Sequence, residues 1–216
     1  MPVRKFLAKD KLYHVLTKSI AGYRIFNEPT DFERMLDILE YYNTTKPPCK
    51  FSKYLTLTAE EKLNLSVPQC NKIVKIIAYC IMPTHIHLLV SPLEDNILSR
   101  YMNIVLRSYT GYFNYKYKRK GPLWESRFKA VIVNSNEQLL HLTRYIHLNP
   151  TTAYLVERPE DWEFSSYNEY IGKPATRKLT DFLEYLDINP TSYTEFVNDR
   201  INYQRELAKI KDMILE

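Results

Sequence analysis

Hydrophobic and polar positions along the chain predict seven elements in the order strand, helix, strand, strand, helix, strand, helix. Strands are indicated by alternating or continuously apolar runs, and helices by apolar residues that recur every three or four positions. In chain order the segments are 11–26, 30–42, 74–82, 85–90, 96–118, 129–133 and 137–148. This order favours an α+β fold, a ferredoxin-like antiparallel sheet with helices on one face.

Local signals mark the helix ends and the limits of the domain. Thr30 with Glu33 three residues later predicts a capping box at the start of the first helix. Proline disfavours helical backbone in the residue before it, so Pro150 predicts that the last helix stops at or before Asn149. We expect one domain over 1–172, in which the polar, proline-marked stretch 43–70 is an insertion, and a helical C-terminal extension over 173–216.

Composition narrows the function classes. The 216 residues carry a formal net charge of +5, which permits a polyanionic partner without requiring one. Only 4 residues are glycine, and neither GxGxxG nor GxxxxGK[ST] occurs, which excludes nucleotide-cofactor enzymes of those two kinds. Three cysteines without a CxxC pair argue against a disulfide scaffold. With no apolar run of spanning length, we expect a soluble protein of a reducing compartment and no membrane partner.

Two histidines two positions apart form the first candidate site. His85 and His87 lie in the fourth periodic segment, and side chains i and i+2 of a strand point to the same face. Both imidazoles could therefore reach one metal ion. Two histidines on a strand are more often plain surface or packing residues, so both interpretations stay open at this point.

The last helix carries the second candidate site. His141, Tyr145 and Asn149 are spaced i, i+4, i+8 and form a stripe on one face, while His147 falls on nearly the opposite side. Taken alone, Tyr145 is an ordinary amphipathic tyrosine and Asn149 a residue typical of a helix C-terminus.

A basic cluster lies at the end of the helix 96–118 and in the residues just after it. Its cations are interrupted by tyrosines, a composition that suits a single nucleic-acid strand because charge neutralises phosphates and aromatic rings stack on bases. A solvated helix end explains the same residues equally well. The cations are Lys116, Lys118, Arg119 and Lys120.

Four motifs that follow one another along the chain connect these candidate residues to one family pattern. MPTHIHLLV, GPLWESRF, RYIHLNPTTAYLV and DWEFSSYNEYIG follow one another at residues 82–90, 121–128, 144–156 and 161–172. This pattern resembles the single-tyrosine HUH transposases of the IS200 type, and most closely the REP-associated tyrosine transposases. The resemblance spans roughly residues 11–172, fits poorly over 43–70, and implies the HUH endonuclease fold. A cytoplasmic, nucleoid-associated location is implied only by this family resemblance.

The resemblance implies a role for each candidate residue. His85 and His87 become metal ligands, Asn149 takes the place of the polar third ligand, and Tyr145 becomes the nucleophile that forms a 5′-phosphotyrosine. Mg²⁺ or Mn²⁺ is the implied cofactor. His141 is a further possible catalytic residue that could contact the phosphate or accept the phenol proton, and a plain surface histidine is an equal alternative. The segment around Trp124 and Arg127 adds both residues to the DNA-binding candidates.

The implied activity is cutting and rejoining of single-stranded DNA at hairpin-forming, REP-like palindromes, by a monomer more readily than by a homodimer. Within the class, a replication- or transfer-initiating nickase is the alternative. Outside it stand a hairpin-binding regulatory protein without cleavage activity and a zinc-dependent hydrolase built on His85 and His87. Family members often have Gln at the position of Glu125 and an Arg-Ala-Gly run where this chain has Thr152-Ala153-Tyr154.

Overall fold

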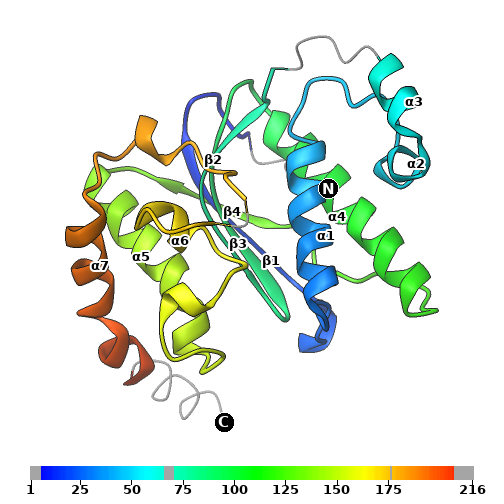
Figure 1. Cartoon of the computed structure of the whole chain (residues 1–216). Coiled ribbons are helices and arrows are strands. Elements are labelled where there is room, and N and C mark those ends of the chain that lie inside the picture. The colour runs from blue at the N-terminus through cyan, green and yellow to red at the C-terminus, as the bar shows by residue number, and fades with distance from the viewer. Residues whose placement is uncertain (1–5, 66–70, 176, 207–216) are drawn as a thin grey trace.

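The computed structural model describes residues 6–65, 71–175 and 177–206 and centres on one antiparallel sheet (Figure 1). The sheet order is β2-β3-β1-β4 and every neighbouring pair is antiparallel. This is the strand order of a split βαβ, so the α+β, ferredoxin-like prediction is confirmed. The strands are β1 (Leu12–Lys18), β2 (Val74–Met82), β3 (His85–Pro92) and β4 (Lys129–Val133).

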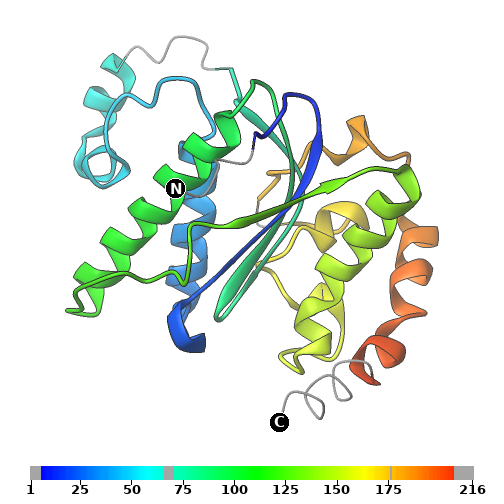
Figure 2. The same ribbon diagram turned by 180° about the vertical axis from the view of Figure 1, so that it is seen from behind.

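Helices cover both faces of the sheet, which corrects the expectation of one covered face (Figures 1 and 2). On one side, here called the α1/α4 face, lie α1 (Pro29–Tyr41) and α4 (Ile97–Lys116). On the other, the α5 face, lie α5 (Asn136–Thr152), α6 (Tyr167–Tyr170) and α7 (Pro190–Asn198). The reason is the composition of β2 and β3, which are buried at nearly every position and therefore need apolar cover on each face.

The first helix begins two residues earlier than the predicted capping box. Its N-cap is Glu28, and the Asp31 carboxylate accepts hydrogen bonds from the backbone N–H groups of Asn27 at 3.0 Å and Glu28 at 3.2 Å. Pro29 takes the first helical position, where its missing N–H costs nothing. The prediction of Thr30 and Glu33 as the capping pair was therefore wrong.

Helix α5 continues through Pro150 to Thr152, so the predicted stop before Asn149 was also wrong. A proline inside a helix leaves the carbonyl four residues earlier without its usual donor, which here is the carbonyl of Ile146. The side-chain amide of Asn149 donates to this carbonyl at 3.4 Å and to that of Tyr145 at 2.8 Å. Asn149 thus supplies part of the hydrogen bonding that Pro150 removes.

The insertion and the C-terminal segment contain short helices. A short helix of the insertion, α3 (Ala59–Asn64), has Thr58 as its N-cap, and Glu61 completes the capping box. Residues 201–206 of the predicted C-terminal extension are helical, and its part over 207–216 lies outside the described residues. The remaining short elements are α2 (Phe51–Thr56), η1 (Ile20–Gly22), η2 (Pro159–Asp161) and η3 (Phe182–Glu184). In the described part of the chain, every helix is too short or too polar to cross a lipid bilayer.

Candidate active site

The two histidines of β3 lie on the α5 face. Ile86 between them is 1% exposed and packs in the α1/α4 core, so the alternation of the strand turns His85 and His87 the other way. Their ring centroids are 5.0 Å apart. The predicted pairing of these imidazoles on one face is therefore confirmed.

A third histidine, His14 on β1, belongs to the same cluster. Its Nε2 lies 2.9 Å from Nδ1 of His87, and the two rings stack with centroids 5.2 Å apart and an interplanar angle of 10°. Strand β1 pairs with β3 so that Leu16 stands opposite His87 and His14 opposite Leu89, which makes the two histidines diagonal neighbours. Sequence reasoning missed His14, because its only signal is its place between the inward-facing Tyr13 and Val15.

Helix α5 brings the tyrosine to this cluster. The ring centroid of Tyr145 is 5.5 Å from that of His87 and 6.2 Å from that of His14, edge-on in both cases. Tyr145 is 41% exposed and His87 only 2%, while His85 is half-buried. The cluster thus reaches solvent through Tyr145 and His85. Two motifs 58 residues apart in the chain meet here.

A buried polar network fixes α5 against the sheet. His147, fully buried on the inner side of α5, lies 2.7 Å through Nδ1 from the Tyr193 hydroxyl and 2.8 Å through Nε2 from the Ser166 hydroxyl. The Ser166 hydroxyl in turn accepts a hydrogen bond from the backbone N–H of Tyr79 on β2 at 2.9 Å. Both ring nitrogens of His147 are therefore used, and the helix that carries Tyr145 is tied to β2 and to α7.

The site is neutral around pH 7. Burial, and to a smaller extent the nearby charge of Lys18, lowers the pKa of His85 to about 4. Burial also lowers the pKa of His14, and it holds that of His87 well below the usual value, with the neighbouring histidines adding to the effect. The pKa of Tyr145 is raised, mainly by burial. The three imidazoles are thus uncharged and the phenol keeps its proton.

The donor set fits a divalent cation. Nδ1 of His85 lies 2.9 Å from the Thr84 hydroxyl and Nδ1 of His87 is paired with His14, which leaves Nε2 of each ring for a metal. Hydrogen-bonding one nitrogen in this way fixes the orientation of a ligating imidazole. Among the described residues no group of three His, Cys, Asp or Glu could hold a metal. A third protein ligand would have to be a different group, and the amide oxygen of Asn149, one turn after Tyr145, stays the predicted candidate.

His141 lies at the edge of α5 that faces α7. Its Nδ1 is 2.8 Å from the guanidinium of Arg144, and its ring centroid is 5.6 Å from that of Phe196. Arg144 itself stacks on Phe196 at 4.0 Å. These contacts account for His141 at the α5–α7 interface, and its role in the reaction stays a prediction.

Three of the six DNA-binding candidates have partners inside the protein. The Lys116 ammonium contacts the buried Asp31 carboxylate at 2.7 Å, and Arg119 donates to Asn114 and to the carbonyls of 121 and 122. The Trp124 indole N–H donates to the Leu106 carbonyl at 3.1 Å. These three side chains therefore have structural roles that sequence spacing did not reveal.

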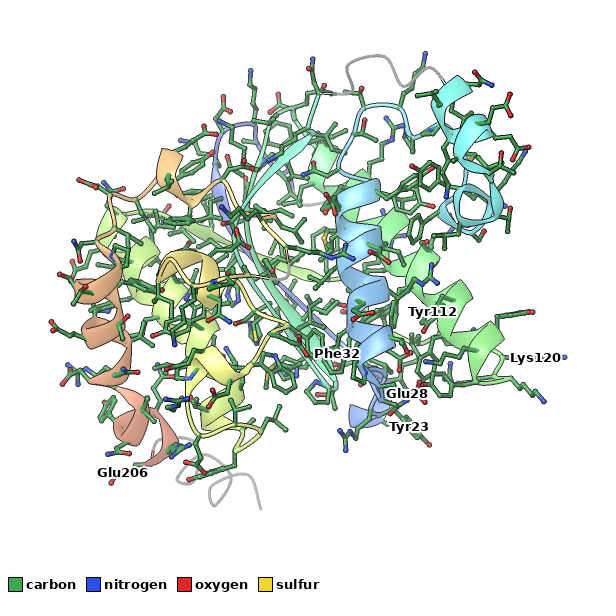
Figure 3. The ribbon with its side chains drawn as sticks, viewed as in Figure 1. Tyr23, Glu28, Phe32, Tyr112, Lys120 and Glu206 are labelled. Atoms are coloured by element: carbon green, nitrogen blue, oxygen red, sulfur yellow. The ribbon has the colours of Figure 1, made fainter. Side chains whose placement is uncertain are left out.

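The other three candidates are exposed. Lys118, Lys120 and Arg127 make no ion pair with any residue in the described ranges, and Lys120 projects from the end of the turn after α4, away from the body of the molecule (Figure 3). They are the cations of the predicted set that are free to meet phosphates.

Comparison with known proteins agrees with the geometry. Residues 53–149 match the sequence family described as "Transposase IS200 like". A protein of Haemophilus influenzae named as a REP-associated tyrosine transposase is 30% identical over 103 residues, which cover 43% of this chain and 58% of the relative. The chain thus matches somewhat more than half the length of that curated relative.

A solved structure shares the fold. The structure of a REP-associated tyrosine transposase bound to a REP hairpin superposes with a TM-score of 0.52 at 17% identity, over 88% of this chain and 99% of that one. The sequence resemblance deduced from the four motifs is thereby confirmed. Over residues 53–149 this chain is similar to the IS200-like transposases, and it has the fold of the solved REP-associated tyrosine transposase.

Proposed function

We propose that the protein is a metal-dependent endonuclease and strand transferase that cuts and rejoins single-stranded DNA through Tyr145. The observation that carries the proposal is the edge-on contact of the Tyr145 ring with His87, 5.5 Å between centroids, on the one face of the sheet that gathers histidines. A phenol and neutral imidazoles meet there, and a phosphodiester transfer needs a positioned nucleophile and groups that can hold a charge-neutralising cation.

In the reaction, the Tyr145 phenol oxygen attacks phosphorus and the bond from phosphorus to the 3′-oxygen breaks. The products are a 5′-phosphotyrosine and a free 3′-hydroxyl, and the proton lost by the phenol is balanced by the one gained by the leaving oxygen. One phosphodiester replaces another, so the hydroxyl can reverse the step and join strands. Because burial raises the pKa of Tyr145, the phenol stays protonated until DNA is bound.

His85, His87 and Asn149 would hold Mg²⁺ or Mn²⁺, which when bound would neutralise charge on the phosphoryl oxygens. The lowered pKa values of both histidines keep their nitrogen lone pairs available at neutral pH. The amide of Asn149 donates through nitrogen to its own helix, which leaves its oxygen for the ion. His14 pairs through Nε2 with Nδ1 of His87 and would fix the orientation of that imidazole.

The substrate is proposed to be a DNA hairpin with a single-stranded flank, since the protein of the solved relative binds a REP hairpin. Lys118, Lys120 and Arg127 would contact its phosphates. The enzyme is proposed to act as a monomer, in which α5 packs on the sheet of its own chain.

The test is a covalent trapping experiment. Labelled hairpin DNA with a single-stranded flank is incubated with the protein and Mn²⁺, and a protein–DNA adduct that survives denaturation is expected. Proteolysis and mass spectrometry should map the adduct to Tyr145. Tyr145→Phe and excess EDTA should each abolish it. Tyr203→Phe, a control at a tyrosine that is 52% exposed, should leave it unchanged.

Other outcomes favour the alternatives. Hairpin binding without any adduct would support a regulatory protein that has lost cleavage. No binding of hairpin DNA, with Zn²⁺-dependent hydrolysis of another substrate, would support a hydrolase. An adduct that persists in Tyr145→Phe would show that another residue is the nucleophile.

A further inference from the structure

Side chains of α1, α4 and the insertion line a groove. These elements lie on the side of the sheet opposite α5 (Figure 1). The groove lies between α1, α4 and the insertion that carries α2, and it has a volume of about 1380 Å³. The proposed active site is on the other face of the sheet, so the nuclease chemistry does not use this groove.

The groove is basic. Four cations line it and no carboxylate does, and none of the four forms an ion pair with a described residue: Arg34, Lys50, Arg100 and Arg107. Elsewhere in the chain several surface cations have acidic partners, as Arg177 does with Asp37 and Arg158 with Asp161. Unpaired arginines gathered in one concave surface produce a positive potential that attracts a polyanion.

Aromatic rings stand among these cations. The guanidinium carbon of Arg34 lies 4.8 Å from the ring centroid of Tyr112 and 5.3 Å from that of Phe51, so two rings and a planar cation form one stacked group. Tyr115, further along α4, is 89% exposed. Exposed rings beside arginines are the platform on which unpaired bases stack.

Gly111, which lines the groove, has room for a larger side chain, so packing does not require glycine at this position. Gly111 lies inside α4, where glycine weakens a helix, and a Cβ added there would meet no atom within 4 Å. The groove-facing stripe of α4 runs Arg100, Asn103, Arg107, Gly111, Tyr115, so the gap falls between a cation and a ring. A bare backbone at that point permits close approach of a ligand.

We infer that this groove binds a single-stranded nucleic-acid segment, separate from the strand held at Tyr145. The stripe from Arg100 to Tyr115 is about 22 Å long at 1.5 Å per residue, which accommodates about six nucleotides stacked at ~3.4 Å. The inference goes beyond the proposed function, since it concerns binding alone and would hold if cleavage were absent.

The experiment measures binding of fluorescein-labelled oligo(dT)12 to the full-length protein by anisotropy over a range of salt concentrations. Arg100→Gln/Arg107→Gln should weaken binding about tenfold and reduce the salt slope by roughly 1.4, because each phosphate contact on a single strand contributes about 0.7. Lys178→Gln/Arg200→Gln removes the same charge outside the groove and should change affinity less than twofold.

Gly111→Ala is expected to raise stability and to lower the affinity for oligo(dT). The added methyl group should raise the thermal midpoint by about 2 to 4 °C, because alanine favours the helix, and should still weaken oligo(dT) binding several-fold. Unfolding cannot explain a loss of affinity in a more stable protein. Tyr115→Ala should weaken binding, whereas Tyr115→Phe should retain it.

The outcomes separate this inference from the nuclease proposal. Tyr145→Phe should bind oligo(dT) normally, and the arginine double variant should still form the adduct with a short hairpin. Equal affinities of the groove and control double variants would overturn the inference. So would a dimer–monomer equilibrium that shifts only in the groove variants, because the groove would then hold a second copy of the chain.

Discussion

The two faces of the sheet are equally well covered but differ in what they bury. The α1/α4 face buries hydrocarbon and aromatic groups, and its buried charge, Asp31, lies at a helix end where five hydrogen bonds satisfy it. The α5 face buries imidazoles and hydroxyls beneath the helix that carries Tyr145. The interior of one face is therefore mainly apolar, whereas the other places polar side chains beneath the helix that carries Tyr145.

Two buried histidines of the α5 face differ in how many of their ring nitrogens have a partner inside the protein. His147 has both ring nitrogens paired at 2.7 and 2.8 Å inside the protein. His87, equally buried, has one nitrogen paired with His14. Burial alone does not distinguish them, whereas the remaining nitrogen does.

The largest expected effect is on the α1/α4 face. Asp31→Ala removes the acceptor of Lys116, Tyr112 and Tyr117 and should lower the free energy of unfolding by about 3 to 5 kcal/mol. Urea denaturation measures this loss. Glu33→Ala, an exposed acid in the same helix, should change stability by less than about 0.5 kcal/mol. Adduct formation per folded molecule should be normal in both variants, and its loss in Asp31→Ala would contradict the division between the faces.

The same carboxylate predicts behaviour in acid. Burial alone would raise the pKa of Asp31, but hydrogen bonds from Lys116, Tyr117 and Tyr112 and from the backbone lower it overall. Its contribution to stability is therefore complete above the ordinary pKa and is lost as the pH falls through the lower, folded value. Asp31→Asn should show a flatter decline below about pH 4.

On the α5 face, His147 predicts a second pH dependence. Burial lowers its pKa to about 3, so between pH 6.5 and 3 the unfolded chain binds the proton and the folded protein does not. Stability should thus fall on acidification, by roughly 2 kcal/mol from this group between pH 7.5 and pH 5. His147→Gln should show a correspondingly smaller loss in urea titrations at the two pH values.

Much of this comparison could be predicted from the sequence. Periodicity predicted the order of the elements, and four motifs with their resemblance to the IS200-like transposases singled out His85, His87, Tyr145 and Asn149, because each signal lies within one element. What could not be predicted depends on contacts between distant segments. His14 meets His87 across 73 residues, and Lys116 meets Asp31 across 85.

The local errors have the same origin. The predicted helix stop before Pro150 was wrong because the Asn149 amide partly replaces the missing backbone donor. The predicted capping pair was wrong because Asp31 is the capping residue, and it is held there by hydrogen bonds from two tyrosines and a lysine of α4 and the residue after it. The expectation of one covered face was wrong because β2 and β3 are buried at nearly every position, which is typical of strands that pack on both faces.

A smaller effect is expected at His14. His14→Phe keeps a ring in place but removes the partner of His87 Nδ1, so Mn²⁺ should bind about tenfold more weakly, at the lower end of the effect of losing such a partner. Isothermal titration calorimetry of the DNA-free protein measures this directly. His141→Phe is the control and should bind Mn²⁺ normally. Equal affinities in all three proteins would mean that His14 only packs against His87.

The smallest effect distinguishes exposed cations from paired ones. Lys118→Gln/Lys120→Gln should weaken hairpin DNA binding a few-fold and reduce the salt slope by up to about 1.8, since each phosphate contact on a duplex contributes about 0.9. Lys116→Gln should leave the slope unchanged because its ammonium contacts Glu28 and Asp31, and it should instead lower stability. Filter binding at several salt concentrations, with urea denaturation of the same samples, separates the two effects. A reduced slope for Lys116→Gln would show that DNA competes with Asp31 for this lysine.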